Sequence, residues 1–432
     1  MHSLKALLAV LLTCAMAPAG AQLLGGGGGL GGLGGLPGGL LSPGGAGSVG
    51  GVDTIRAVGS GVSSLPSSLL SLRRDRQLSL VRENRNELDV DDAGNPIRRD
   101  EIVGINLSAE SLAKADAAGF RVDRHEAISE SGLDLTILQP PARKPARKAI
   151  KQLRASDPAG NYTLDHVYEP ARGPVGAAPG AALQRPAGDA AAPIGLIDGG
   201  VGNHPVFDGV AVEQRGFAGS PRPSGHGTAV ASLLVGRGAS FNGAAPGHAL
   251  LVADIYCGSA ANGSAVAIAR ALAWLGTRGV GVVNISLVGP GNPLLEAAVK
   301  ALQSRGVLVV AAVGNDGPAA PPQFPASYPG VVAVTGVDAK GKVLIEAGRA
   351  SHLDFAAPGA DLAAAVPGGR WEAVRGTSFA APFVAGTLAR LYNGDARQVL
   401  TRLGAQAKPG RNVGRGIICG ECRTLPRTVG LR

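Results

Sequence analysis

Short apolar runs alternate with helix-like stretches between residues 190 and 405, and this alternation limits the fold more than any other feature of the chain. The runs are rich in Val, Ile and Leu, which is typical of strands buried on both faces of a sheet. They begin at Ile194 and occupy residues 250–255, 280–285, 307–313 and 331–337, with helices expected at 229–234, 264–275 and 293–303. The pattern predicts an α/β fold in which helices cover both faces of a mostly parallel sheet.

One serine stands at the entrance of a further apolar helix. The stretch from Gly376 to Gly386 reads GTSFAAPFVAG and places Ser378 where this helix begins. Unpaired N–H groups and the positive end of the helix dipole can stabilise an oxyanion there, so the position suits a nucleophile. Ser and Thr are also common N-caps, so the stretch alone is equally consistent with an ordinary buried helix.

Two upstream segments add a carboxylate and an imidazole. Asp198 ends the run that begins at Ile194, which delivers its side chain to the carboxyl edge of the sheet. His226 lies between two glycines where another apolar helix starts. An Asp after a strand is usually a turn or cap residue, and an isolated His is usually a structural side chain. Asp, His and Ser together in these settings are much harder to explain in that way.

Three short blocks resemble, in the same order, the signature blocks of the subtilisin-like serine proteases: Asp198-Gly199-Gly200, His226-Gly227-Thr228 and Gly376-Thr377-Ser378. The resemblance covers about residues 190–405 and implies a three-layer α/β/α fold. It also implies a triad in which Ser378 attacks the peptide carbonyl, His226 moves the proton and Asp198 orients the imidazole. That chemistry requires no cofactor and no metal, and no prediction is made for calcium.

The same resemblance assigns an oxyanion hole and a substrate strand. Asn315 matches the family residue whose side-chain amide donates to the oxyanion, together with the backbone N–H of Ser378. The expected substrate-binding residues, which would pair with an extended peptide, are Ser286, Leu287, Val288, Gly289 and Gly314. Val288 stands where glycine is usual and Gln323 lies near the expected pocket floor, which suggests a modified primary pocket.

Two residues depart from the family pattern beside the triad. Gly199 replaces the usual Ser or Thr after the aspartate, which removes a hydroxyl that could hold the carboxylate; we expect this change to be tolerated. Phe379 replaces the usual Met after the nucleophile, and the only methionines, Met1 and Met16, lie in the leader. We therefore expect the processed enzyme to resist peroxide, because it holds no thioether to oxidise.

The first hundred residues are expected to comprise a signal peptide, a linker and a helical segment. Residues 1–21 combine Lys5, an apolar run and an Ala-Gly-Ala end, which is typical of a signal peptide. Residues 22–51 form a Gly-rich linker that cannot build a core, and residues 52–100 an Arg-rich helical segment with a helix over 67–88. The product is expected to be secreted, into the periplasm or the medium.

Residues 101–172 follow the order strand, helix, strand, strand, helix, strand. This order weakly resembles the inhibitory propeptide of the subtilisin-like proteases, a ferredoxin-like α+β module that would lay its final strand, expected at 162–167, along the substrate groove. A stand-alone binding module is the alternative. A Pro/Gly/Ala-rich linker at 173–192 is expected to contain the maturation site, with self-cleavage between Tyr168 and Ala192; the catalytic domain then spans 193–405.

A basic tail is expected at 406–432. The chain holds 41 Lys and Arg against 32 Asp and Glu, a net charge of +9, but no recognised nucleic-acid motif, so nucleic-acid binding is rejected as the main role. No run after the leader is long enough to span a membrane. Cys257, Cys419 and Cys422 remain after the leader is removed; a Cys419–Cys422 disulfide, a redox pair, or a bridge from Cys257 to either are all open.

The sequence thus predicts a secreted, monomeric serine endopeptidase that acts on protein or peptide substrates and is made as a precursor inhibited by its own propeptide. The alternative is an exported Gly-rich surface protein whose protease-like domain serves only binding or self-release.

Overall fold

The computed structural model describes residues 65–171, 180–184 and 192–431. The expected signal peptide, the Gly-rich linker and most of the stretch expected to hold the maturation site lie outside the described residues.

A seven-stranded sheet, all of whose pairings are parallel, organises the larger part of the described chain, in the order β16-β15-β14-β12-β7-β11-β8. Its strands are β7 (Ile194–Asp198), β8 (Val212–Gly216), β11 (Leu250–Asp254), β12 (Val282–Ile285), β14 (Leu308–Ala312), β15 (Val332–Val337) and β16 (Phe355–Pro358). The five predicted strands are the inner ones. The edge strands β8 and β16 were missed because one carries Glu, Gln and Arg and the other is four residues long and ends in proline.

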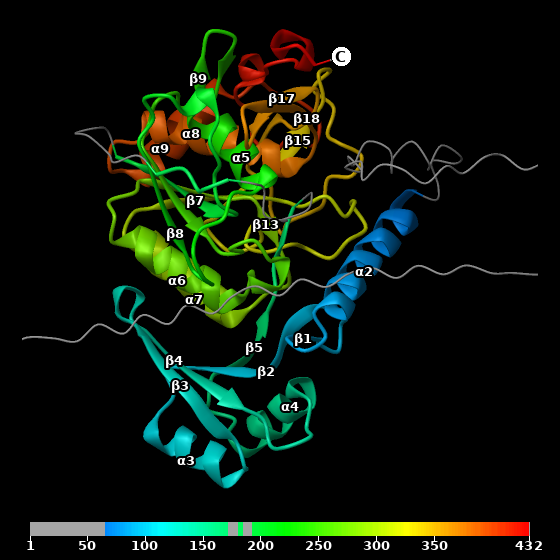
Figure 1. Cartoon of the computed structure of the whole chain (residues 1–432), viewed down its shortest axis with the longest axis vertical. Coiled ribbons are helices and arrows are strands. Elements are labelled where there is room, and N and C mark those ends of the chain that lie inside the picture. The colour runs from blue at the N-terminus through cyan, green and yellow to red at the C-terminus, as the bar shows by residue number, and fades with distance from the viewer. Residues whose placement is uncertain (1–64, 172–179, 185–191, 432) are drawn as a thin grey trace, which may run out of the picture. The chain divides into compact units, whose positions relative to one another are not determined.

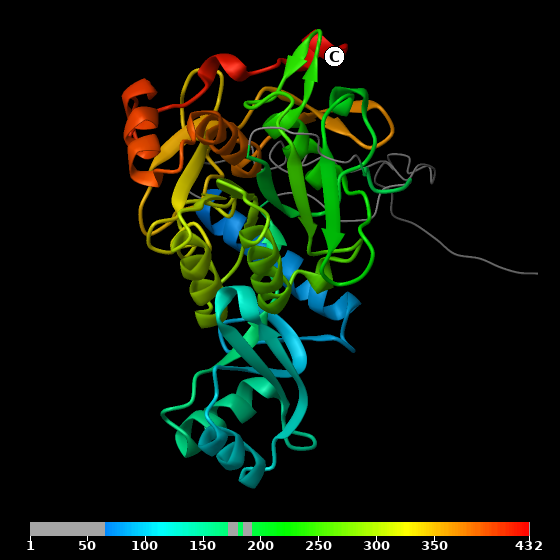
Figure 2. The same ribbon diagram turned by 90° about the vertical axis from the view of Figure 1, so that its left-hand side faces the viewer.

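Helices cover both faces of this sheet (Figure 1), which confirms the three-layer α/β/α fold. Helices α5 (Gly225–Val235) and α8 (Ala381–Leu391) cover one face, and α6 (Ala265–Gly276) and α7 (Pro293–Gln303) lie side by side on the other (Figure 2). Neighbouring residues of a strand point to opposite faces of the sheet. In β7, Leu196 packs in the core under α5 and α8, and Ile197 packs in the core under α6 and α7. Helix α9 (Ala396–Gln406) packs on α8.

A smaller module has the predicted ferredoxin-like order. It consists of β2 (Pro96–Ile105), α3 (Ala109–Ala117), β3 (Arg121–Ile128), β4 (Leu133–Gln139), α4 (Ala146–Ser156) and β5 (Tyr162–His166). The strands lie in the order β5-β2-β4-β3, and the short β1 (Leu88–Val90) pairs with the start of β2. The expected module boundary at residue 101 is wrong, because it cuts β2. The sequence did not indicate the first half of this strand, because residues 98–101 are all charged.

The Arg-rich segment before this module contains helix α2 (Leu65–Glu83), which ends five residues before the predicted end at Leu88. The backbone N–H groups of Glu87 and Leu88 bond to the carbonyl of Asn84, so a turn replaces the last helical turn. Within the described residues, no helix is both long and apolar enough to cross a membrane.

The predicted boundary at 405/406 is also too early. Backbone hydrogen bonds join Gly416 and Ile418 to Ala356 of β16, and the Val413 side chain is buried. The tail is thus part of the fold, and it carries a Cys419–Cys422 disulfide while Cys257 is a free thiol. Two hairpins complete the larger part: β9 (Arg237–Gly238) with β10 (Phe241–Asn242), and β17 (Leu362–Val366) with β18 (Arg370–Val374).

Candidate active site

The structure brings Asp198 and His226 together at the carboxyl end of the sheet. Asp198 is the last residue of β7, and His226 lies in the first turn of α5, whose N-cap Ser224 accepts the N–H of Gly227. The Oδ1 of Asp198 lies 2.9 Å from Nδ1 of His226 and also accepts the Gly199 N–H at 2.7 Å. Both side chains are buried. The carboxylate is therefore placed to orient the imidazole and to stabilise its protonated form.

The second oxygen of Asp198 has no hydrogen-bond partner among the described residues. This agrees with the sequence, because Gly199 offers no hydroxyl where a Ser or Thr is usual.

Ser378 lies in a 3₁₀ turn, η4 (Thr377–Phe379), directly before α8. The ring of Phe379 lies 5.5 Å from the ring of His226, which places this turn beside the imidazole. Ser378 and His226 are not hydrogen-bonded to each other: Ser378 Oγ donates to the carbonyl of Ser286 at 3.4 Å, and Nε2 of His226 has no partner within the described chain. Such bonds are often long or absent before the reacting complex forms.

Asn315 is held in one orientation and donates to a backbone carbonyl. It follows β14, and its Oδ1 accepts the backbone N–H of Thr377 at 3.0 Å. Because the acceptor atom is fixed in this way, Nδ2 points outward and donates to the carbonyl of Ala171 at 2.6 Å. The predicted oxyanion-hole amide thus already binds a peptide carbonyl of the same chain.

The strand predicted to bind substrate is occupied by residues 169–171. Strand β6 (Glu169–Pro170) pairs antiparallel with β13 (Leu287–Val288), and the N–H of Ala171 donates to Ser286 O at 3.0 Å. The predicted groove occupant, 162–167, is wrong in its position: residues 162–166 are β5, inside the small module, and residues 169–171, which follow β5, pair with the substrate strand.

Tyr168 anchors this segment and was not identified from the sequence. Its side chain is completely buried, and its hydroxyl donates to Pro290 O at 2.7 Å. The ring lies against the predicted substrate residue Gly289, where an added Cβ would come within 2.4 Å of it. Burial raises the pKa of the Tyr168 hydroxyl well above its usual range. The Tyr256 hydroxyl donates to the carbonyl of Tyr168 at 3.1 Å.

Val288 and Gln323 fill the space beside Gly314. A Cβ added to Gly314 would lie 3.3 Å from a methyl of Val288 and 3.3 Å from Cγ of Gln323. Gln323 is buried, and its amide donates to Pro321 O at 2.7 Å, so the side chain is fixed. Val288 and Gln323, the two residues that suggested a modified primary pocket, therefore both lie against Gly314.

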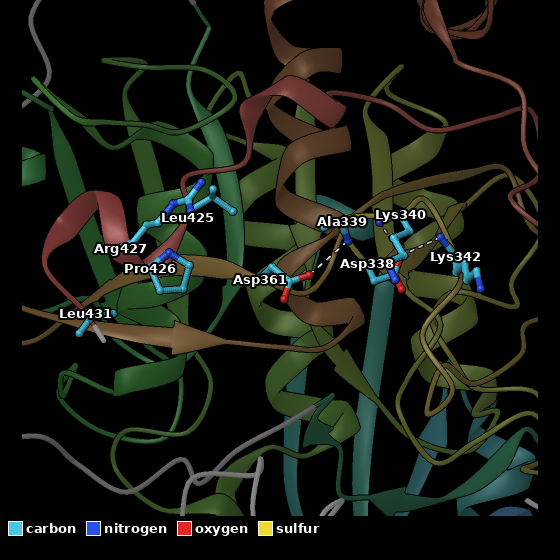
Figure 3. A pocket seen from close by; sticks show the side chains of 9 residues that line it. All are labelled: Asp338, Ala339, Lys340, Lys342, Asp361, Leu425, Pro426, Arg427 and Leu431. Atoms are coloured by element: carbon cyan, nitrogen blue, oxygen red, sulfur yellow. Dashed lines mark hydrogen bonds between the residues drawn. The ribbon is translucent and has the colours of Figure 1, made fainter.

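A separate surface pocket of about 670 Å³ contains none of the predicted site residues (Figure 3). It is lined by the turn at 338–342, Asp361 and the C-terminal tail. Its carboxylates serve local turns, because Asp338 accepts the N–H groups of Lys340 and Lys342, and Asp361 accepts that of Ala339. These contacts explain the acidic groups without a ligand.

Cys419, Glu421 and Cys422 also lie close enough to hold a metal ion, but the disulfide occupies both sulfur atoms.

Comparison with known proteins gives consistent matches. A model described as the subtilase family matches residues 190–406. The chain is 36% identical over 201 residues to the alkaline protease of Alkalihalobacillus alcalophilus, covering 45% of this chain and 52% of that relative. It is 35% identical over 201 residues to subtilisin Savinase of Lederbergia lenta, covering 45% of this chain and 74% of the relative. The chain therefore spans about half the length of the first of these relatives.

Two solved structures share the fold. Fervidolysin from Fervidobacterium pennivorans, a keratinolytic enzyme related to subtilisin, matches with a TM-score of 0.62 and 19% identity, over 76% of this chain and 61% of that structure. The epidermin leader peptide processing serine protease of Staphylococcus aureus matches with a TM-score of 0.56 and 15% identity, over 77% and 99%. At these identities the likeness concerns the fold alone.

Proposed function

Because the chain belongs to the subtilase family, we propose that it is a serine endopeptidase that uses Asp198, His226 and Ser378. The observation that carries the proposal is the carbonyl of Ala171, which lies on the Asn315 amide while its N–H bonds to Ser286, next to the buried Asp198–His226 pair. A backbone carbonyl of the chain thus accepts a hydrogen bond from the amide that we propose stabilises the oxyanion.

Each residue of the proposed triad, together with Asn315, has one role in the reaction. Ser378 Oγ attacks the carbonyl carbon, and its proton moves to Nε2 of His226, which no other described group occupies. Asp198 accepts the Nδ1–H bond and stabilises the imidazolium. Asn315 donates to the oxyanion, and the imidazolium then protonates the leaving amine, which leaves an acyl-enzyme. Water, deprotonated by the same imidazole, releases the acid product and restores the serine.

The protein is proposed to be made as a precursor that cleaves itself between Ala171 and Arg172. The N–H and carbonyl of Ala171 make the contacts expected of the residue that supplies the acyl group, so we expect Ser378 to cleave the bond that follows it. This lies within the interval Tyr168 to Ala192 expected for self-cleavage, but before the linker at 173–192 that was expected to contain the maturation site.

The small module is proposed to act as the intramolecular inhibitor. Its buried Asp165 accepts the Val266 N–H at the start of α6, and Arg270 of α6 forms a bidentate ion pair with Glu126 of β3. These contacts would keep β6 in the groove after cleavage, so the pro-region must leave before substrates bind. The leader at 1–21 is proposed to direct secretion of this precursor.

Labelling with a fluorophosphonate, together with a casein assay, tests the activity. The processed wild-type protein is expected to be labelled and to hydrolyse casein, whereas Ser378→Ala should do neither. Absence of both in processed wild-type protein would contradict the proposal and favour a binding or self-release role.

A further inference from the structure

Two arginines of α2 hold a carboxylate beside the oxyanion-hole residue. Nη2 of Arg76 lies 2.6 Å from Oδ1 of Asp316, and Nε of Arg73 lies 3.4 Å from its Oδ2. The Asp316 side chain is 6% exposed, and both of these cationic partners come from the region N-terminal to the proposed cleavage point. Asp316 directly follows Asn315, so a buried negative charge lies within one residue of the site.

The same arginine also approaches the chain segment in the groove. Nε of Arg76 lies 3.7 Å from Oε2 of Glu169, whose partner in the groove is Val288. Glu169 is the third residue N-terminal to the proposed scissile bond, counting Ala171 as the first. Alternate residues of an extended strand project to the same side, so the side chains of Glu169 and Ala171 share one face. Arg76 thus bridges the carboxylates of Glu169 and Asp316.

Glu169 is a poor occupant of this position without α2. Burial raises the pKa of its carboxyl, and the nearby charge of Asp316 raises it further, while Arg76 opposes both effects. Its Oε1 is buried without a hydrogen-bond partner in the described chain. A carboxylate that faces another carboxylate needs a cation between them, and here the cation is supplied by α2.

Departure of α2 would leave Asp316 without either ion-pair partner. Leu69 of the same helix lies over Gly317, where an added Cβ would come within 2.8 Å of the leucine, so removal of α2 also uncovers the loop that carries Asp316. An uncompensated carboxylate at a groove edge is most simply satisfied by a cation from the substrate. A Lys or Arg side chain is longer than Glu and can carry its charge toward the position of the Arg76 guanidinium.

We propose that Asp316 forms an anionic subsite in the processed enzyme, which binds a lysine or arginine side chain at the third substrate residue N-terminal to the cleaved bond. This subsite rests on the endopeptidase function proposed above. The pro-region, with Glu169 at that position, is then cleaved only because Arg73 and Arg76 of its own helix occupy the subsite. In the processed enzyme, a basic side chain of the substrate takes the place of these two arginines.

The test uses the processed enzyme and three chromogenic peptides that copy residues 168–171. The peptides are acetyl-Tyr-Xaa-Pro-Ala-p-nitroanilides in which Xaa is Arg, Gln or Glu. Wild-type kcat/KM is expected to fall about fivefold from Arg to Gln and about fivefold again from Gln to Glu, the size of a partly exposed charge interaction. Asp316→Asn should bring the three values within about twofold. In ~1 M NaCl the wild-type differences should shrink, because the screening length falls to roughly 3 Å.

Glu372→Gln provides the matched control, because it also removes one negative charge but lies exposed on β18, outside the groove residues. It should keep the wild-type order of peptides. Equal hydrolysis of all three peptides by wild type, or a preference for the Glu peptide, overturns the proposed subsite. If the same protein is still labelled by the fluorophosphonate, the proposed endopeptidase function stands. Loss of the order in Glu372→Gln as well overturns the role of Asp316. No hydrolysis and no labelling overturn both proposals.

Discussion

Replacement of Tyr168 with alanine is expected to slow self-cleavage about a hundredfold. Tyr168 is the residue that fastens the cleavable segment into the groove. Its N–H donates to Gly263 O at 2.7 Å, its carbonyl accepts from Tyr256, and its ring is completely buried against Gly289. The substitution leaves the backbone contacts in place and removes the ring.

The magnitude follows from what the ring loses. Truncation of a fully buried aromatic side chain to alanine typically costs about 3–5 kcal/mol, including the cavity that remains. The lower value applies here, since the peptide segment can shift into part of the space. A cost of ~3 kcal/mol in docking lowers the population of the cleavable arrangement about a hundredfold. Tyr168→Phe keeps the ring and loses the hydroxyl with its 2.7 Å bond to Pro290 O, which should cost about 1 kcal/mol, or roughly fivefold.

The assay is the time course of precursor disappearance on a gel after dilution from denaturant, for wild type, Tyr168→Phe and Tyr168→Ala. The same two substitutions in the Ser378→Ala background report folding, because those proteins should melt cooperatively without cleavage. Cleavage of Tyr168→Ala within threefold of wild type would show that burial of the ring does not hold the segment in the groove. So would equal slowing by Phe and Ala, because the effect would then belong to the hydroxyl and not to ring burial.

Three further predictions concern other residues. Asn315→Ala should slow self-cleavage and peptide hydrolysis by about a hundredfold, the cost found on removing such a donor in a subtilisin, with little change in KM; a change in KM alone would assign the amide to substrate binding. Burial raises the pKa of Asp165 to about 6, so the folded Ser378→Ala precursor binds an extra proton between about pH 4 and 6, and its stability should fall as pH rises through that window and level off above it. Urea unfolding across the same pH range measures this loss of unfolding free energy, which is ~3 kcal/mol at most, and Asp165→Asn should remove it. An unchanged loss in Asp165→Asn would show that another group titrates. The processed enzyme, with Phe379 after the nucleophile and no methionine beyond Met16, should keep its activity in dilute peroxide, and rapid inactivation would contradict this.

The central strands and the Asp198–His226 pair could be predicted because their signals are local. A buried parallel strand reads as an apolar run, and each motif lies where such a strand ends or a helix begins. The edge strand β8 gave no such signal, because Glu, Gln and Arg interrupt its apolar pattern, although Gln214 is buried and bonded to the backbone. The tail was predicted as a basic segment separate from the catalytic domain because its charge is visible in the sequence, whereas the pairing of Ile417 with Ala356 is not.

The parts of the site that could not be predicted depend on pairing between distant segments. The sequence indicated that the pro-region would enter the groove, but the register of β6 against β13, more than a hundred residues later, determines that Ala171 meets Asn315. The contact of Arg76 with Asp316 spans 240 residues and leaves no local pattern. Periodicity reports which face of an element is buried, but not which partner buries it.

The most direct measurement is the N-terminal sequence of the large fragment that forms when the purified wild-type and Ser378→Ala precursors are each refolded alone. We predict that the wild-type fragment begins at Arg172 and that Ser378→Ala remains uncut. A wild-type fragment that begins elsewhere, or a Ser378→Ala precursor cut at the same bond and rate, would contradict it.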